Sequence, residues 1–261
     1  MWITDNLNQD YKQQFTFKHK ITEYKAADIH LELFSTEGFE DVVLLNQKDV
    51  FYKTSINEEA QMLSFSAYST HEDPKRALIY GSLNLELAYL LSKLGLKVDM
   101  VVQDLEALNV LSGFFPHFKE VMSEGKVKIS TSFSSFMGTQ FDLVYHLGVL
   151  QANELSAIKK MMDKKGIFIY SPSSLPNLAL LKANIALATA CFNILMPFSL
   201  PFSLSKKIYA YASDTYHPLA SLLLQKSDML EDATYYNSRL HESAFILPTN
   251  LKVLLKNLVK N

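Results

Sequence analysis

The sequence predicts an α/β fold, with a small N-terminal β domain ahead of a larger domain built on a parallel sheet. Two observations carry this prediction. Residues from about 16 to 52 form short strand patterns, and from Lys75 onward apolar strands alternate with helices. Strands that are apolar throughout and separated by helices imply a parallel sheet covered on both faces.

The first part of the chain is predicted to be a set of short strands followed by one helix. Ile29 to Leu33 alternates apolar and polar residues, and Val42 to Leu45 forms another strand after the turn near Gly38. A helix is predicted from Ile56 to Tyr68, before a polar run at 69–74 that leads into the second part. The expected domains are residues 1–54 and 55–261.

The second part alternates strands with helices. Helices are predicted from Asn84 to Leu94 and from Glu154 to Met162, each ended by a nearby glycine. The predicted strands are 77–80, 98–102, 127–129, 143–145, 167–170 and 207–212. The apolar stretch from Leu178 to Met196 contains Lys182, Asn184 and Asn193, which favours a buried amphipathic helix over a membrane span.

Composition narrows the classes of function. Hydrophobic residues make up 48% of the 261 residues and charged residues 20%, which is typical of a globular protein. The net charge of -2 gives no reason to expect nucleic acid or a membrane surface as a partner. A single cysteine, Cys191, argues against an intrachain disulfide and a multi-thiolate metal site. The N-terminus lacks a signal-peptide pattern, so we expect a cytoplasmic protein.

Candidate ligand contacts follow the predicted strands, because ligands of doubly wound sheets bind outside the carboxyl ends of the strands. Gly81 and Ser82 offer backbone N–H groups at a helix N-terminus. Asp104 is suited either to ribose hydroxyls or to capping the next helix. His146 ends a strand as either a catalytic or a structural histidine, and Glu58 and Glu59 are suited to a solvated helix face. No metal-ligand spacing, P-loop or nucleophile elbow is present.

The C-terminal region carries an ordered motif: Tyr235-Tyr236-Asn237, then His241, then Ala244 to Pro248. Read as YYN-x-x-x-H-x-x-AF-x-LP, it resembles the C-terminal signature of the spermidine synthase (polyamine aminopropyltransferase) family. Weaker likenesses extend over essentially the whole chain, at Trp2, 74–79, 114–116, 141–144 and 165–168. The chain therefore resembles a divergent bacterial member of that family.

The resemblance implies a Rossmann-like, methyltransferase-type domain after the small β domain, usually in a homodimer. It also implies transfer of an aminopropyl group from decarboxylated S-adenosylmethionine to putrescine or a related diamine. The products would be spermidine and methylthioadenosine, with the nucleoside sulfonium as co-substrate and no other cofactor or metal.

Most positions where that family keeps its chemistry are altered here. The GGGDGG loop corresponds to Gly81–Glu86, with Asn84 at the acid, and the two acids of the D-S-S-D loop fall on Leu147 and Leu150. The ribose-binding glutamate falls on Val102, which leaves Asp104. Other family motifs fall on 130–132, on 59–61 and, for a tyrosine, on Phe202.

The resemblance therefore predicts which residues bind the substrates, but it does not identify the catalytic base. This set is Gly81, Ser82, Asn84, Asp104, Thr131, Gln61, Phe202 and Trp2. The catalytic base is unknown, with His146 and Asp104 as candidates, and Glu58 or Glu59 as substitute acids. Three functions stay open: a divergent aminopropyltransferase, a non-catalytic nucleoside- or polyamine-binding or structural subunit, and a methyltransferase that uses intact S-adenosylmethionine.

Overall fold

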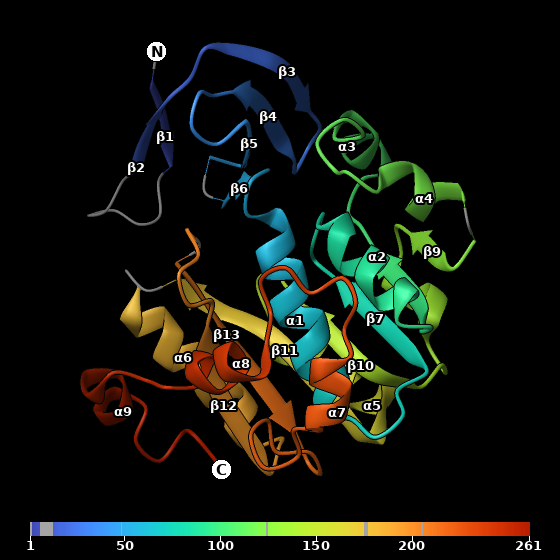
Figure 1. Cartoon of the computed structure of the whole chain (residues 1–261), viewed down its shortest axis with the longest axis vertical. Coiled ribbons are helices and arrows are strands. Elements are labelled where there is room, and N and C mark those ends of the chain that lie inside the picture. The colour runs from blue at the N-terminus through green and yellow to red at the C-terminus, as the bar shows by residue number, and fades with distance from the viewer. Residues whose placement is uncertain (1, 6–12, 48, 124, 175–176, 205) are drawn as a thin grey trace.

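A seven-stranded sheet organises the larger part of the chain (Figure 1). The computed structural model describes residues 2–5, 13–47, 49–123, 125–174, 177–204 and 206–261. The strand order is β12-β13-β11-β10-β7-β8-β9. The strands are β7 (Arg76–Tyr80), β8 (Lys97–Val101), β9 (Val127–Ser130), β10 (Phe141–His146), β11 (Met162–Ser174), β12 (Ile194–Ser199) and β13 (Lys207–Ser213). Strands β9, β8, β7, β10 and β11 pair in parallel, whereas β13 is antiparallel to both of its neighbours.

Helices cover both faces of this sheet, because successive strand residues send apolar side chains to opposite sides. Ile79 and Tyr145 belong to a core shared with α1 (Ile56–Thr70) and α2 (Leu85–Lys93). Their neighbours Leu78 and Val144 belong to a second core, shared with α5 (Ala152–Met161), α6 (Leu178–Thr189) and α9 (Thr249–Leu254). The predicted α/β fold with a mostly parallel, two-sided sheet is confirmed.

The N-terminal strands form two small antiparallel sheets at one end of the molecule (Figure 1). One pairs β1 (Trp2–Asp5) with β2 (Gln13–Thr16), and the other contains β3 (His19–Lys25), β4 (His30–Ser35), β5 (Asp41–Leu45) and β6 (Asp49–Tyr52). Trp2 lies in β1, but its side chain lies outside the described part of the chain. The domain boundary at residues 54 and 55 stays a prediction.

Two predicted segments differ from the structure. The helix α1 continues to Thr70, whose hydroxyl group contacts the hydroxyl of Tyr211 on the sheet at 2.9 Å, so the polar run contributes to the core rather than only linking two parts. The expected single helix from Leu178 to Met196 is wrong, because α6 ends at Thr189 and β12 begins at Ile194. Pro197 fits this strand because β12 lies at the sheet edge, where a missing N–H leaves no ladder bond unmade.

The C-terminal signature forms a hydrogen-bonded brace. Tyr236 and His241 are both buried, and the Tyr236 hydroxyl lies 2.9 Å from Nδ1 of His241. Nε2 of His241 lies 2.9 Å from the carbonyl oxygen of Pro218. Since a carbonyl only accepts, Nε2 carries the proton and Nδ1 accepts from the tyrosine, which fixes a neutral imidazole. Asn237 caps α8 (Ser238–Ala244) through the N–H of Leu240.

This brace predicts a loss of stability in mild acid. Burial lowers the pKa of His241 to about 4, below the ordinary value of 6.5, so the unfolded chain binds the proton more tightly. Stability is then lost as pH falls from about 6.5 toward about 4, and between pH 7 and pH 5 the loss from this residue is about 2 kcal/mol. Urea unfolding at both pH values measures it. The His241→Phe variant, less stable at pH 7, should show a smaller loss, and an equal loss in both proteins would contradict the assignment.

Among the described residues, no helix is long and apolar enough to cross a lipid bilayer.

Candidate active site

The ends of the parallel strands bring several of the predicted residues to one edge of the sheet. The loops after β7, β8, β9 and β10 contain Gly81, Asp104, Thr131 and Gly148. Because β13 runs antiparallel to β11, its first residue, Lys207, pairs with Ser174 near the end of β11 and lies at this same edge. Residues far apart in the sequence therefore meet here, where ligands of open α/β sheets bind.

The loops after β7 and β10 are in direct backbone contact. A Cβ atom placed on Gly81 would lie 2.7 Å from the amide nitrogen of Gly148, and Gly81 has a φ of +72°. Both features require glycine, since a side chain would collide with the neighbouring loop and the backbone is left-handed. The hydroxyl of Ser82 accepts a hydrogen bond from the N–H of Asn84, which shapes the turn into α2.

We expect Gly81→Ala to destabilise the protein by about 2–3 kcal/mol, since it combines backbone strain with a clash against Gly148. Gly95→Ala is the matched control: Gly95 also has a positive φ, of +89°, but among the described residues no atom beyond its two chain neighbours lies within 4 Å of its Cβ position. The control should lose only about 1 kcal/mol. Urea unfolding of both variants separates strain from collision, and equal losses would show that the contact between the loops is easily displaced.

Asp104 is a helix cap that also joins the N-terminal sheet to the strand ends. Its Oδ1 accepts from the N–H groups of Glu106 and Ala107, at 2.8 and 3.3 Å, as the cap of α3 (Leu105–Val110). Its Oδ2 accepts from the hydroxyl of Tyr24 in β3 at 2.7 Å. The Tyr24 hydrogen bond lowers the pKa of Asp104, so the carboxylate stays ionised and can only accept. Capping does not use all of its lone pairs, so ribose binding stays open.

A buried carboxylate lies at the centre of this edge. Glu59, on the first turn of α1, is only 8% exposed, which excludes the solvated helix face as its environment. Its Oε2 accepts from Nδ2 of Asn84 at 3.0 Å, and its Oε1 accepts from the hydroxyl of Tyr209. Nζ of Lys207 lies 3.6 Å from the same Oε1. A buried carboxylate needs such partners, because an uncompensated charge away from water is costly.

A small cavity of about 30 Å³ adjoins Glu59 and Lys207. Phe51 of β6 also lines it, and the ammonium of Lys207 lies 4.7 Å from the centre of the Phe51 ring. The neighbouring Glu58 has a buried Oε2 with no hydrogen-bond partner in the described part of the chain. Burial, with a smaller contribution from Glu58, raises the pKa of Tyr235. Two acids therefore lie on the first turn of α1, whereas the loop after β10 has Leu147 and Leu150 at the positions where the resemblance leads us to expect acids.

Asn84, Gln61 and Phe202 lie differently from the expected substrate-contacting positions. The buried Asn84 uses its side chain to cap α2 and to hold Glu59. Gln61 is fully buried and holds the start of the C-terminal signature in place. Its Oε1 accepts hydrogen bonds from the N–H groups of residues 234, 235 and 236. Its Nε2 donates to the hydroxyl of Thr234 and to the carbonyl oxygen of Asp232. Phe202 is 97% exposed at a loop tip with a φ of +62°. Thr131 is exposed at the edge, as expected.

His146 lies beneath the edge rather than in it. The residue is 1% exposed, and its Nδ1 has no hydrogen-bond partner among the described residues. Its Nε2 lies 3.5 Å from Glu154, and its ring packs at 4.8 Å against Tyr80, whose hydroxyl donates to Glu154. Burial lowers its pKa, which favours the neutral imidazole. This environment supports a structural rather than a catalytic histidine.

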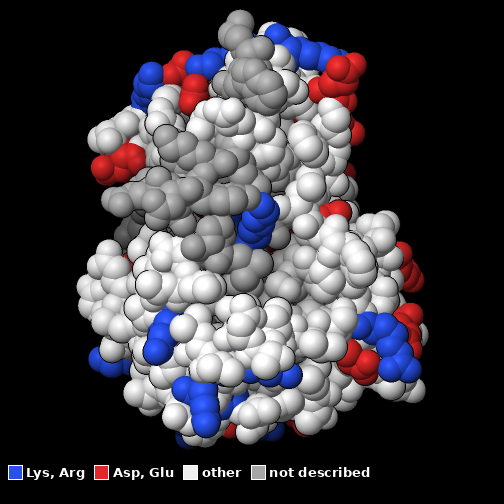
Figure 2. Space-filling view, turned by 90° about the vertical axis from the view of Figure 1, so that its left-hand side faces the viewer, with Lys and Arg blue, Asp and Glu red and all other residues white. Residues whose placement is uncertain are grey.

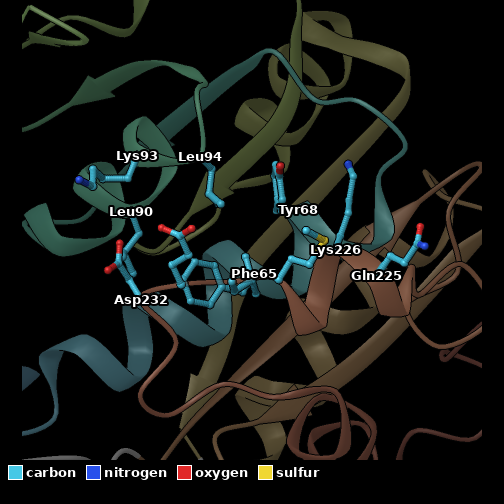
Figure 3. Close-up of a pocket in the computed structure, with 11 residues that line it drawn as sticks. Phe65, Tyr68, Leu90, Lys93, Leu94, Gln225, Lys226 and Asp232 are labelled. Atoms are coloured by element: carbon cyan, nitrogen blue, oxygen red, sulfur yellow. The ribbon is translucent and has the colours of Figure 1, made fainter.

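Two further features lie away from the strand ends. A cavity of about 640 Å³ lies between α1, α2 and α7 (Leu224–Asp228), and Figure 3 shows Phe65 and Tyr68 of α1 along it. The ammonium of Lys226 lies 4.5 Å from the centre of the Tyr68 ring. On the N-terminal sheet, Glu23, His30 and Glu32 are close enough to ligate a metal. The ammonium of Lys20 already bonds to both carboxylates, at 2.9 and 2.6 Å, so this group is a closed ion-pair network.

Sequence reasoning assigned no site role to Lys207, Tyr209 or Tyr24. For Lys207 and Tyr209 the sequence does contain an indication. Side chains alternate between the two faces of a strand, so Lys207, Tyr209 and Tyr211 share one face, and a lysine on the same face as two buried tyrosines is unusual. For Tyr24 the sequence offers none, because its partner Asp104 lies 80 residues away.

The chain is similar to known proteins over its whole length. No family model matches the chain. Over 264 residues, covering all of both chains, it is 30% identical to the polyamine aminopropyltransferase of Helicobacter pylori and 31% identical to that of Helicobacter acinonychis. Its fold matches a spermidine synthase in complex with the transition-state analogue AdoDATO, with a TM-score of 0.87, 14% identity, and coverage of 98% of this chain and 94% of that one.

The spermidine synthase of Thermotoga maritima gives a TM-score of 0.85, with the same identity and coverage. At this identity the structures support the fold, whereas the full-length relatives at 30% identity establish the family. The chain belongs to the polyamine aminopropyltransferase (spermidine synthase) family.

Proposed function

We propose that this protein is an aminopropyltransferase of polyamine biosynthesis. It moves an aminopropyl group from decarboxylated S-adenosylmethionine to putrescine or a related diamine, giving spermidine and methylthioadenosine. Family membership supports the reaction class. The observation that carries the proposal for this chain is the buried carboxylate of Glu59 at the strand ends, which supplies negative charge for a cationic acceptor.

The reaction is a substitution at carbon. The acceptor nitrogen uses its lone pair to form a bond to the carbon next to the sulfonium, and the carbon–sulfur bond breaks. Its electron pair neutralises the sulfur, so methylthioadenosine leaves, and the nitrogen loses one proton. The step is redox-neutral, and the protein has to position the two substrates and hold the amine in its neutral, attacking form.

For the donor, we propose binding along Gly81, Ser82, Asp104 and Thr131. Backbone groups of the Gly81 turn face the start of α2, where a helix N-terminus offers N–H groups. The ionised Asp104 suits ribose hydroxyls, which would donate to it. Trp2 stays in the proposed set by resemblance. The protein would need no further cofactor, since the sulfonium itself activates the carbon.

For the acceptor, we propose that Glu59 and Glu58 replace the two missing acids of the loop after β10. Leu147 is half-buried and Leu150 is buried, so neither position supplies charge. Glu59 is held rigidly by Asn84 and Tyr209, and Oε2 of Glu58 has no hydrogen-bond partner among the residues that the structure describes. We therefore assign Asn84 and Gln61 positioning roles, not direct contact with substrate.

The test is to incubate the purified protein with decarboxylated S-adenosylmethionine and a panel of di- and polyamines, and to measure products by mass spectrometry. Methylthioadenosine together with an aminopropylated amine would support the proposal and identify the acceptor. A folded protein that gives no product with any amine would overturn it in favour of a non-catalytic binding or structural subunit. Methyl transfer from intact S-adenosylmethionine would instead indicate a methyltransferase.

We also propose a cytoplasmic homodimer. Figure 2 shows the side of the molecule that carries α6 and α9, and most of the side chains described there are neither acidic nor basic. Leu178, Leu180 and Leu187 of α6 are exposed, which is unfavourable for an isolated chain and suits contact with a second copy. Sedimentation equilibrium of the purified protein distinguishes a dimer from a monomer.

A further inference from the structure

We propose that Lys207 determines acceptor specificity: its ammonium occupies the cation position beside Glu59, so a cationic acceptor must compete with it. This inference rests on the proposed function and extends it to the choice of amine. Lys207 is the first residue of β13, on the strand face that also carries the buried Tyr209 and Tyr211.

The surroundings of the Lys207 ammonium are those that recognise an alkylammonium ion. A carboxylate oxygen of Glu59 lies 3.6 Å from Nζ, and the Phe51 ring centre lies 4.7 Å from it. A carboxylate combined with an aromatic face is a favourable environment for ammonium groups, both in side chains and in ligands. The side chains of Lys207 and Glu59 are 22% and 11% exposed, so solvent screens their interaction only partly.

The cavity limits how many cations this position accepts. At about 30 Å³, it has room for about one water molecule or one ammonium group. A second ammonium next to Lys207 would share one carboxylate and meet a like charge in a partly buried setting. An amine that would place an additional ammonium group in this cavity is therefore expected to bind less well than an amine with fewer charges.

The experiment compares Lys207→Met with the unchanged protein, using putrescine, a diamine, and spermidine, a triamine, as acceptors. Methionine keeps much of the apolar stem and removes the charge. We expect the ratio of kcat/KM for the triamine to that for the diamine to rise about tenfold, mainly through a lower KM for the triamine. Lys207→Arg retains the charge and should leave the ratio within about twofold. Lys182→Met, which removes an exposed charge on α6, controls for net charge and should also leave it unchanged.

An unchanged ratio in Lys207→Met, or an equal loss of activity with both amines, would overturn the inference, because a structural residue affects both acceptors alike. If Lys207→Met does not fold, Lys207→Gln provides the same change in charge. Calorimetry of amine binding keeps the inference separate from the proposed function. If the unchanged protein has no turnover, the proposed function fails, yet about tenfold tighter triamine binding by the folded variant would still support the role of Lys207. Binding that is equal in both proteins would overturn it.

Discussion

Replacing Glu59 with glutamine is expected to lower kcat/KM for diamine acceptors by about 100-fold or more, because in our proposal the acceptor loses the carboxylate that compensates its charge. Glutamine has nearly the same shape, and its oxygen can still accept from Asn84 while its amide donates to the hydroxyl of Tyr209. The fold should therefore persist. Steady-state production of methylthioadenosine measures the effect.

The control for this prediction is Glu120→Gln, which removes an exposed carboxylate on α4 (Phe118–Ser123) and should keep kcat/KM within about twofold. Circular dichroism and urea unfolding of both variants establish that they are folded. If Glu59→Gln retains most of its activity, the acid that serves the acceptor is not Glu59. Glu58→Gln would then be the decisive variant, since Glu58, at the same helix start, has a buried oxygen that no other described residue hydrogen-bonds.

The sheet could be predicted from the sequence because local patterns determine it. Strands such as Leu143–Tyr145 are apolar throughout, which occurs where helices cover both faces, and the intervening helices show caps and glycine stops. From Leu178 onward the sequence predicts one helix instead of a helix and a strand, because α6 and β12 are both apolar. What separates α6 from β12 is tertiary: the N–H of Asn193 donates to Asp214, and β12 then pairs with β13.

The candidate site could be predicted only where a residue's position in a strand determines it. Gly81 and Asp104 directly follow strands, so the topology of a parallel sheet places them at the edge. The pairing of Glu59 with Tyr209 joins residues 150 positions apart, and no periodicity indicates such a contact. Gln61 lies two residues from Glu59, but it points into the core instead of toward the edge.

The proposed function gives the altered positions a common physical explanation. Leu147 and Leu150 leave the loop after β10 without negative charge at these two positions, whereas Glu59 supplies a carboxylate on α1 that bonds to Asn84. Lys207 then restores neutrality near Glu59. In the proposed function, the acid that serves the acceptor therefore lies on α1 instead of the loop after β10.

The second large effect is expected at Gln61. Gln61→Leu should destabilise the protein by about 2–4 kcal/mol, because the N–H groups of Thr234, Tyr235 and Tyr236 lose their common acceptor. The hydrogen bond from Tyr236 is buried and the other two are partly buried, and a buried donor left without a partner costs about 1–3 kcal/mol. Gln61→Glu keeps an acceptor for these groups and should lose less. Urea unfolding measures both, with Gln225→Leu, at an exposed position, as a control that should change by no more than about 0.5 kcal/mol.

The pattern of effects at Gln61 distinguishes a structural clamp from a substrate contact. A residue that binds substrate would raise KM in the leucine variant while the stability of the free protein stayed the same. A clamp lowers stability first, and it loosens the neighbouring Tyr235, whose hydroxyl donates to the carbonyl of Pro201 in the loop that carries Phe202. A loss of less than about 1 kcal/mol in Gln61→Leu would mean that water or another group satisfies the three N–H groups. The C-terminal signature would then be held by packing around Tyr236 and His241, and Gln61 would again be a candidate for substrate binding.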